Sequence, residues 1–329
     1  MARSSREIIP FSALPLDPTG PPGNAWGRFG PDDQLGMLNL LTPEVVASAA
    51  RENILTGKRI SLDWSLNEPS FPSYGRQAFR HEIIQKGAPG RCVNDDVLTF
   101  NTQGGSQWDG FRHYGNLEAR RYYNNTTHEE IHSPSSTILG IDAWASSGGI
   151  VGRGILLDYK SWAEKNSIPL SPLTSTPIRL AHLHQLISSK NITFHPGDIL
   201  FIRSGFISAY TSLTPIEQAS LPSRPSADFA GLESTPEVLE WLWTNQFAAV
   251  AGDAPAFEMS PVGNPETDPR FVLHQWLLAG WGMPIGEMFD LEVLSEMCQM
   301  EGRWSFFVSS VPLKVPGGVA SPPNAVAIF

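Results

Sequence analysis

The clearest element of the chain is the run Ile150-Val151-Gly152-Arg153-Gly154-Ile155-Leu156-Leu157-Asp158-Tyr159. Its short apolar character between turn residues predicts a buried strand. An amphipathic helix is expected next over 178–189, and Pro196-Gly197-Asp198 then leads into an apolar strand over 199–203. Strand, helix and strand in this order are typical of α/β proteins, so the run at 150–159 sets the fold class.

The same alternation continues to the carboxyl end of the chain. The patterns predict helices and strands in turn: a helix over 236–243, a strand over 247–252, a helix over 270–279, a turn at Gly280-Trp281-Gly282, a strand over 283–288, a helix over 290–299 and a strand over 304–311.

The first half of the chain is less regular. Thr42-Pro43-Glu44 opens a helix that Gly57 ends, because Thr caps, Pro suits the first helical position and Glu favours the positive end. The remaining expectations are strands at 59–66 and 97–102, a long irregular stretch at 107–135, and a short helix at 141–147. We expect an extended, Pro- and Gly-rich arm over residues 1–31 and a single domain over residues 32–329.

Composition excludes several classes of protein. The net charge is −10 with no basic run, which argues against nucleic-acid binding. No stretch of eighteen apolar residues and no apolar leader occurs, so we expect neither a membrane span nor a secretory signal. Two cysteines exclude a disulfide framework and favour a reducing, cytoplasmic setting. Because GxGxxG, GxxxxGK[ST], HExxH and GxSxG are absent, we expect no nucleotide cofactor.

One segment gathers polar side chains, from Asn101 to Gly115. Gln103, Gln107, Asp109 and His113 are an even number of residues apart, and even offsets share one face of an extended chain. Gly104 and Gly105 permit close backbone approach to a ligand. A hydrogen-bonded turn capped by Asp109 explains the spacing about equally well.

Two further places carry candidate residues. His274 on an expected helix and Glu287 on the following strand suit a metal or a proton relay, although a surface His and a helix-capping Glu explain them as well. Asp253, at the end of an apolar strand, is a candidate buried acid. The pattern favours a structural role for it slightly over a functional one.

Four stretches together resemble the cyclase family that includes bacterial kynurenine formamidase and isatin hydrolase. They are Arg28 to Asn39, Leu139 to Asp142, Gly149 to Asp158, and His274 to Leu291. The resemblance implies a single α/β domain of the swivelling β/β/α type, with a mixed, partly barrel-like central sheet flanked by helices. It also implies a homodimer or larger homo-oligomer and a small-molecule substrate.

The family hallmark HxGTHxDxPxH assigns roles by resemblance. Its first two His and its Asp hold a divalent metal, its last His moves protons, and a distant His and Glu complete the site. Asp109 matches the metal Asp, His113 the last His, and His274 with Glu287 the distant pair. Gln103 and Gln107 replace the two leading His, and Phe111 replaces the Pro.

This departure weakens the expected metal site, because a carboxamide oxygen is a poor ligand for zinc. Asp109, His274 and Glu287, with the amide oxygens of Gln103 and Gln107, remain compatible with Mn, Mg or Zn. A site without metal is also compatible: Gln103 and Gln107 would then donate to a substrate carbonyl while Asp109, His113, His274 or Glu287 move protons.

Other residues of the segment are expected to contact substrate: Trp108, Phe111, Arg112 and Tyr114. Aromatic walls suit a flat substrate, and Arg112 could hold a carboxylate. The first functional hypothesis is a hydrolase that opens an amide, lactam or lactone of a cyclic or aromatic substrate. The alternatives are a metal-independent cyclase, dehydratase or isomerase, and a catalytically silent ligand-binding homologue.

Overall fold

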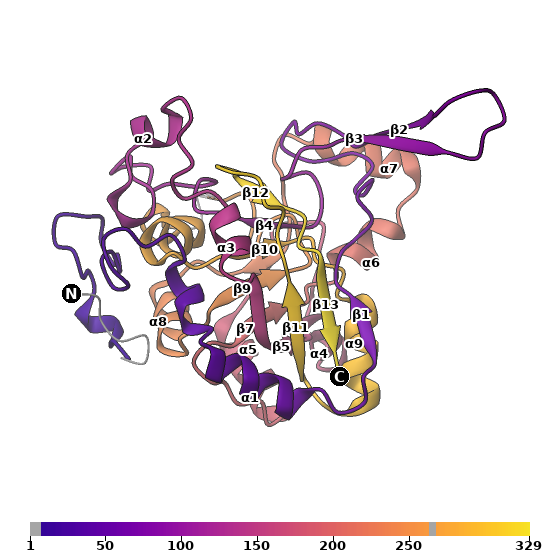
Figure 1. The fold of residues 1–329 in the computed structure, drawn as a ribbon. Helices are drawn as coiled ribbons and strands as arrows, with labels where there is room; N and C mark the ends of the chain where they lie inside the picture. Colours follow the sequence, from indigo (N-terminus) through magenta and orange to yellow (C-terminus); the bar gives the residue numbers. More distant parts are fainter. Residues whose placement is uncertain (1–7, 263–267) are drawn as a thin grey trace.

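A nine-stranded mixed sheet forms the centre of the computed structural model, which describes residues 8–262 and 268–329. The sheet curls into part of a barrel, with helices on its outer side (Figure 1). In the order in which they lie across it, its strands are β1 (Arg59–Ser61), β13 (Ala325–Ile328), β11 (Ser305–Ser310), β5 (Ile150–Leu157), β7 (Ile199–Ile202), β9 (Ala249–Gly252), β10 (Ile285–Glu287), β4 (Gln107–Asp109) and β12 (Ala320–Ser321). The expected fold class is confirmed.

The four central strands β5, β7, β9 and β10 run parallel, and every outer pair is antiparallel. The strands β7 and β9 are buried along their whole length, which explains why their sequences are continuous apolar runs. The strand β5 ends at Leu157 rather than at Tyr159, because Asp158 accepts a hydrogen bond from the Ser161 amide and starts a helix there.

Helices cover the sheet. Six of the α-helices in the described residues are α1 (Pro43–Asn53), α3 (Asp142–Ser146), α4 (Tyr159–Lys165), α5 (Leu180–Ser189), α8 (Pro236–Thr244) and α9 (Glu292–Glu301). Helix α1 packs against β5 and β11, and α5 against β5. Thr42 caps α1 by accepting from the Val45 amide, as its sequence predicts. None of the helices in the described ranges has the length and apolar character that crossing a bilayer requires.

Smaller elements complete the described chain. They are α2 (His128–His132), α6 (Phe206–Thr211), α7 (Pro215–Ser220), the short 3-10 turns η1 (Phe11–Ala13), η2 (Gly36–Leu40), η3 (Tyr123–Asn125), η4 (Leu221–Ser223) and η5 (Pro269–Phe271), and the two-stranded sheet of β6 (Pro177–Ile178) and β8 (Gly231–Leu232).

Several expected elements differ from the structure. The helix expected over 270–279 is instead η5 followed by η6 (Gln275–Trp281), which is π-helical. Gly280 and Trp281 therefore lie inside η6 rather than in a turn, and Gly282, with φ of +64°, ends it. The strand expected over 59–66 is only the three residues of β1: Leu62 still donates to the Ala325 carbonyl, but the regular pairing with β13 ends at Ser61.

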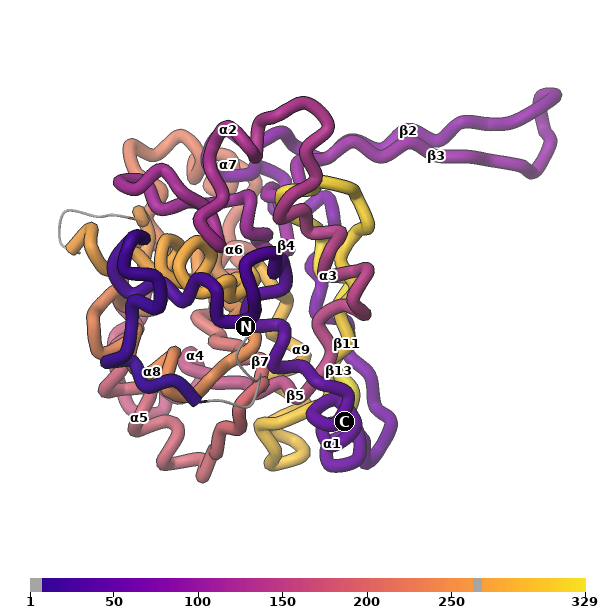
Figure 2. Tube along the Cα trace, turned by 60° about the vertical axis from the view of Figure 1, so that its left-hand side comes forward, coloured from indigo at the N-terminus to yellow at the C-terminus, as the bar shows by residue number. Residues whose placement is uncertain are grey.

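A long β-hairpin projects from the body of the molecule. It consists of β2 (Arg80–Gln85) and β3 (Asn94–Thr99), which form a two-stranded sheet of their own (Figure 1). Both views show it reaching away from the other elements (Figure 2). The strand expected over 97–102 overlaps β3 only in part. Every residue of β3 is exposed, and so are five of the six residues of β2.

The amino-terminal segment, described from residue 8 onward, lies on α8 and η6 of its own chain. Trp243 Nε1 donates to the carbonyl oxygen of Ile9, and Trp26 Nε1 donates to that of Ala279, both at 2.7 Å. Buried indole N–H groups need such acceptors, so these contacts fix the segment against the domain.

Candidate active site

The pairing of β4 with β10 brings the first polar residues together. In the antiparallel register Gln107 lies opposite Glu287 and Asp109 opposite Ile285. Directly opposed side chains on one face are near enough to interact, and Gln107 Nε2 donates to Glu287 Oε2 at 2.7 Å. Two residues that are 180 positions apart in the chain thus share one buried contact.

Gln103 joins this pair from the turn before β4. Its Nε2 donates to Asp109 Oδ1 at 2.7 Å, and its Oε1 accepts from Gln107 Nε2 at 2.9 Å. A carboxylate only accepts hydrogen bonds, so each glutamine must turn its NH₂ group toward the acids. The two amides therefore hold Asp109 and Glu287 in fixed orientations.

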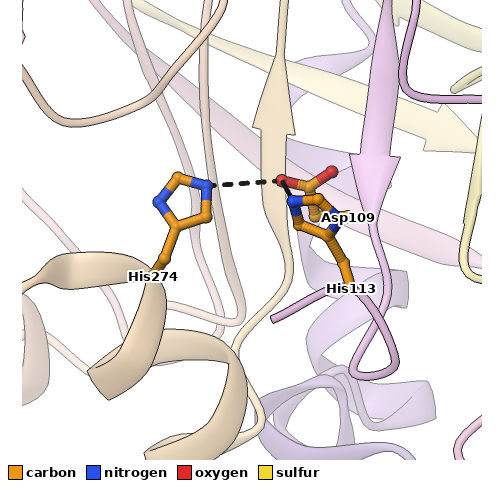
Figure 3. A group of neighbouring side chains, drawn as sticks. All are labelled: Asp109, His113 and His274. Carbon is orange, nitrogen blue, oxygen red and sulfur yellow. Dashed lines mark ion pairs between the residues drawn. The ribbon is translucent and has the colours of Figure 1, made fainter. Parts of the chain in front are cut away.

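His274 enters the cluster from the residue that precedes η6. Its Nε2 lies 3.1 Å from Glu287 Oε1. The same nitrogen lies 3.7 Å from Asp109 Oδ2 (Figure 3). On its other side, Nδ1 lies 2.8 Å from Glu258 Oε2, and the His274 amide donates to Glu258 Oε1. A carboxylate at Nδ1 fixes the orientation of the ring, so Glu258 aims Nε2 at the two acids.

His113 forms the solvent-facing side of the cluster. A turn, in which its amide donates to the Gly110 carbonyl at 2.9 Å, brings Nε2 to 3.9 Å from Asp109 Oδ2. Its side chain is 19% exposed, whereas that of Asp109 is fully buried. Tyr114 packs its ring against His274, with centroids 5.4 Å apart. His113 therefore lies on the solvent side of the cluster, and Asp109 lies behind it.

Burial and charge move the pKa values of these groups in opposite directions. Burial raises the pKa of Glu287 to about 7, and the Asp109 carboxylate adds to the rise. Burial acts in the same sense on Asp109, but His113 and His274 outweigh it and hold the pKa of Asp109 below its ordinary value. Burial lowers the pKa of His113. At His274 burial is outweighed, chiefly by Glu258, and the pKa rises well above its ordinary value.

Two buried oxygens of the cluster, Gln107 Oε1 and Asp109 Oδ2, have no hydrogen-bond partner within the described part of the chain, and the one group that faces Glu287 Oε1 there is His274 Nε2, at 3.1 Å. Such oxygens need a partner such as a proton, a water molecule, a cation or a ligand. Asp109, His113 and His274 each present one ligand atom, and these atoms all lie within 4.8 Å of one another. Two imidazoles and a carboxylate form a donor set that divalent transition metals accept, so these three residues fit a divalent ion.

This donor set differs from the expected one. His113 replaces Glu287 in the group of neighbouring ligand atoms. The amide oxygen of Gln103 is already used, because it accepts from Gln107. Gln107 Oε1, in contrast, has no hydrogen-bond partner in the described residues, and the expectation that the two glutamine oxygens help to hold a metal stays a prediction.

Three residues that were expected to contact substrate lie elsewhere. Trp108 is fully buried on the opposite face of β4, where its ring packs on Phe289 and its Nε1 donates to Ser310. Phe111 is buried between Tyr123 and Trp144. Successive strand residues alternate between faces, which explains why Trp108 points away from its two neighbours.

Arg112 also faces away from the cluster. Its guanidinium donates to three backbone carbonyls, those of Ile138, Gly317 and Ser136. These bonds tie the segment after β4 to two loops and give Arg112 a structural role, so the expected contact with a substrate carboxylate stays a prediction that these bonds do not support.

Two residues of the cluster escaped the sequence analysis. Glu258 is a lone acid in the apolar run Ala254-Pro255-Ala256-Phe257-Glu258-Met259, and that isolation is the one signal that points to it. Arg76 donates to the backbone oxygen of Gln103 at 2.6 Å, and nothing in its local sequence indicates this.

The fold and the cluster together define an α/β protein with a buried acid–imidazole site at the edge of a curled mixed sheet. The chain belongs to the Cyclase family, whose pattern it matches over residues 41–259. A crystal structure described as that of a novel cyclase is 31% identical, with a TM-score of 0.79 over 93% of this chain and 99% of that one.

More distant structures share the fold. Isatin hydrolase A from Ralstonia solanacearum is 17% identical, with a TM-score of 0.59 over 87% of this chain and 97% of that one. An isatin hydrolase bound to the product analogue thioisatinate is 11% identical, with the same TM-score over 88% of this chain and 99% of that one. No curated protein sequence matches the chain. The resemblance inferred from the four sequence stretches is confirmed.

Proposed function

We propose that the protein is an enzyme that hydrolyses an amide, lactam or lactone bond of a cyclic or aromatic small molecule by acid–base catalysis. One observation carries this proposal: Asp109 Oδ2 is a buried acceptor without a hydrogen-bond partner in the described residues, and it lies with Glu287 Oε1 around His274 Nε2, at 3.7 and 3.1 Å. Membership of the Cyclase family and the fold shared with isatin hydrolases support the same class of reaction.

The chain's own residues supply a route for a proton. A water molecule placed at Asp109 Oδ2 would use an acceptor that has no other partner. His113, the partly exposed imidazole, is placed to take a proton from that water as it attacks a carbonyl, and to return it to the leaving nitrogen or oxygen. Gln103, Gln107 and Glu258 keep the acids and His274 in position.

A divalent ion fits the same place and would be held by Asp109, His113 and His274. When bound, it supplies Lewis acidity that polarises the carbonyl to be attacked. Glu287 lies beside that place, with its Oε1 3.1 Å from His274 Nε2, and would serve as a proton acceptor there.

The test is hydrolysis of isatin, an aryl formamide and an aromatic lactone, followed by absorbance. We expect Asp109→Asn and His113→Ala each to lower kcat/KM by at least about 100-fold, the usual effect of removing an acid–base group. His184→Ala, at an exposed position on α5, is the matched control and should stay within about twofold of wild type. Unchanged rates in both site variants, or no turnover of any of the three substrates, would contradict the proposal.

A second candidate is a cyclase, dehydratase or isomerase that works without water as a reactant. The two glutamines favour it, because their amide groups already satisfy one oxygen of each acid without a metal. Reaction in ¹⁸O-labelled water separates the two candidates. Hydrolysis places one labelled oxygen in the product, whereas an isomerisation places none.

A further inference from the structure

The side-chain amide of Gln107 has one fixed orientation in the cluster. Three acceptors surround its Nε2: Gln103 Oε1 at 2.9 Å, Asp109 Oδ1 at 3.3 Å and Glu287 Oε2 at 2.7 Å. Turning the amide over would place its oxygen against these three oxygens and leave its N–H groups without acceptors. The NH₂ group of Gln107 therefore faces the acids, and Oε1 points away from them.

The neighbouring amide of Gln103 confirms this orientation, because its own is fixed from two sides. Its Nε2 donates to Asp109 Oδ1 at 2.7 Å, and a terminal nitrogen of Arg76 lies 3.4 Å from its Oε1. A carboxylate only accepts hydrogen bonds and a guanidinium only donates them. Gln103 thus turns its oxygen toward Arg76 and Gln107. The NH₂ groups of both glutamines are already used, and what Gln107 offers to a ligand is its oxygen.

Gln107 Oε1 is an unused acceptor inside the protein. The Gln107 side chain is fully buried, and Oε1 has no hydrogen-bond partner in residues 8–262 and 268–329. A buried acceptor without a donor is costly, so this oxygen needs a donor from outside the chain. Asp109 Oδ2 is in the same state, and both residues lie on one face of β4 because they are two positions apart.

The donors of the proposed reaction leave this oxygen to the substrate. A water molecule at Asp109 Oδ2 has two O–H groups, and these serve Asp109 and His113, whose Nε2 lies 3.9 Å from the same oxygen. The nitrogen of an amide lies about 1.33 Å from the carbonyl carbon that the water attacks. Gln107 lies two residues from Asp109, roughly 6.6 Å along the strand. A substrate with its carbonyl at Asp109 can therefore turn its N–H toward Gln107.

Only the edge of the substrate that carries C=O and N–H has to enter the buried part of the cluster. His113 and Tyr114 are partly exposed, whereas Gln107 and Asp109 are buried behind them. The rest of the ligand can stay on the side of His113 and Tyr114, whose rings lie 6.1 Å apart. The site thus recognises the bond to be broken, with no need for a closed cavity around a whole ring.

We propose that Gln107 Oε1 accepts a hydrogen bond from the N–H of the scissile amide, so that the site selects secondary amides and lactams over lactones. This rests on the proposed function for the position of the substrate carbonyl. A lactone presents a ring oxygen where the amide has N–H, and two acceptors then face each other. A site built to bond a substrate N–H strongly rejects analogues that lack it, because its buried partner is left unpaired.

Binding of oxindole and of 2-indanone, measured by calorimetry in EDTA, tests this without turnover. Both are a benzene ring fused to a five-membered ring with a carbonyl, and 2-indanone has CH₂ in place of the N–H. We expect wild type to bind oxindole about 10- to 100-fold more tightly than 2-indanone, the effect of one buried hydrogen bond. Gln107→Met should lower this ratio by at least about 10-fold, because it removes the acceptor. Mass spectrometry checks that oxindole stays intact.

Gln103→Met is the matched control. It removes an amide of the same cluster whose oxygen is already used, and Gln107 Nε2 keeps Asp109 Oδ1 and Glu287 Oε2 as acceptors. The ratio should therefore stay within about threefold of wild type, and thermal melting confirms that each variant is folded. Wild type that binds oxindole no more tightly than 2-indanone overturns the proposal, as does an equal fall of the ratio in both variants. A large ratio without hydrolysis of any substrate contradicts the proposed function alone, so the two ideas fail separately.

Discussion

Asp109 and Glu287 lie in one buried cluster, yet their pKa values move in opposite directions. Asp109 faces two imidazoles, whereas Glu287 faces one imidazole and the negative charge of Asp109. The second charge in a shared low-dielectric site costs more than the first, so the pKa of Glu287 rises. Near neutral pH the two acids therefore differ in protonation.

This difference predicts a pH dependence of stability in metal-free protein. The pKa of Glu287 is raised from 4.5 to about 7, so its contribution is fully present below pH 4.5 and is lost as pH rises through 7. Relative to Glu287→Gln, wild type should lose on the order of 3 kcal/mol of unfolding free energy between pH 4.5 and 8. Urea unfolding in EDTA at both pH values measures this. If the difference in unfolding free energy between wild type and Glu287→Gln is the same at both pH values, the pKa of Glu287 is not raised in the folded protein.

At the scale of single residues, part of the site could be predicted from the sequence. Gln103, Gln107, Asp109, His113, His274 and Glu287 were chosen from spacing and from family resemblance, and the structure brings them together. Glu258 and Arg76 were missed, because their roles arise only from tertiary contacts. Trp108 and Phe111 were misplaced, because aromatic composition does not show which side of a strand a ring takes.

The buried acid Asp253 stabilises the start of helix α6 and is not part of the cluster around Asp109. Asp253 follows β9 and accepts hydrogen bonds from the backbone amides of Ser204, Gly205 and Phe206, and from the Ser204 hydroxyl. These amides begin α6 and have no partners within the helix. Asp253 therefore ties β9 to the start of α6, and the Ser204 hydroxyl is occupied by the same carboxylate.

We expect Asp253→Asn to lower the free energy of unfolding by about 2–3 kcal/mol. The new NH₂ group would face backbone donors and leave buried N–H groups without acceptors. Chemical unfolding at pH 7.5 measures the loss. Asp32→Asn, at an exposed position, is the control and should stay within about 0.5 kcal/mol of wild type. Equal stability of the two variants would show that the carboxylate is not needed for the cap.

Elements with a strong burial pattern were predictable and others were not. The strands β5, β7, β9, β10 and β11 were expected from apolar runs near their observed bounds. The β2–β3 hairpin was largely missed because its strands pack on no core, so burial imposes no pattern on its sequence. The π-helix η6 was expected as an α-helix, because apolar spacing over seven residues does not separate the two.

On the scale of the whole molecule, the sheet and its helices form one body from which the hairpin projects. Arg76 and Gln103 flank the hairpin in sequence and contact each other at its base. Arg80 and Thr99 pair directly, so the ends of the hairpin are already adjacent. The expected homodimer stays a prediction, and so does the division into an arm over 1–31 and a domain over 32–329.

Replacing residues 81–98 by Asn-Gly, a two-residue hairpin turn, should leave Tm within about 3 °C of wild type. The removed residues are mostly exposed, and their sheet contains no third strand. Calorimetry measures Tm, and light scattering measures the mass of the assembly. A drop in Tm of 10 °C or more would contradict the expectation, and a parallel drop in mass would mean that the hairpin docks on a second copy.

The hairpin also offers a route to selective chemical labelling. Of the two cysteines in the chain, Cys92 lies exposed near its tip, whereas Cys298 is buried and its pKa is raised to about 12. Only a thiolate reacts readily with a maleimide, so a fluorophore or spin label should attach at Cys92 alone. The unmodified sequence thus provides a single spectroscopic reporter, on a segment that leads directly into the residues of the cluster.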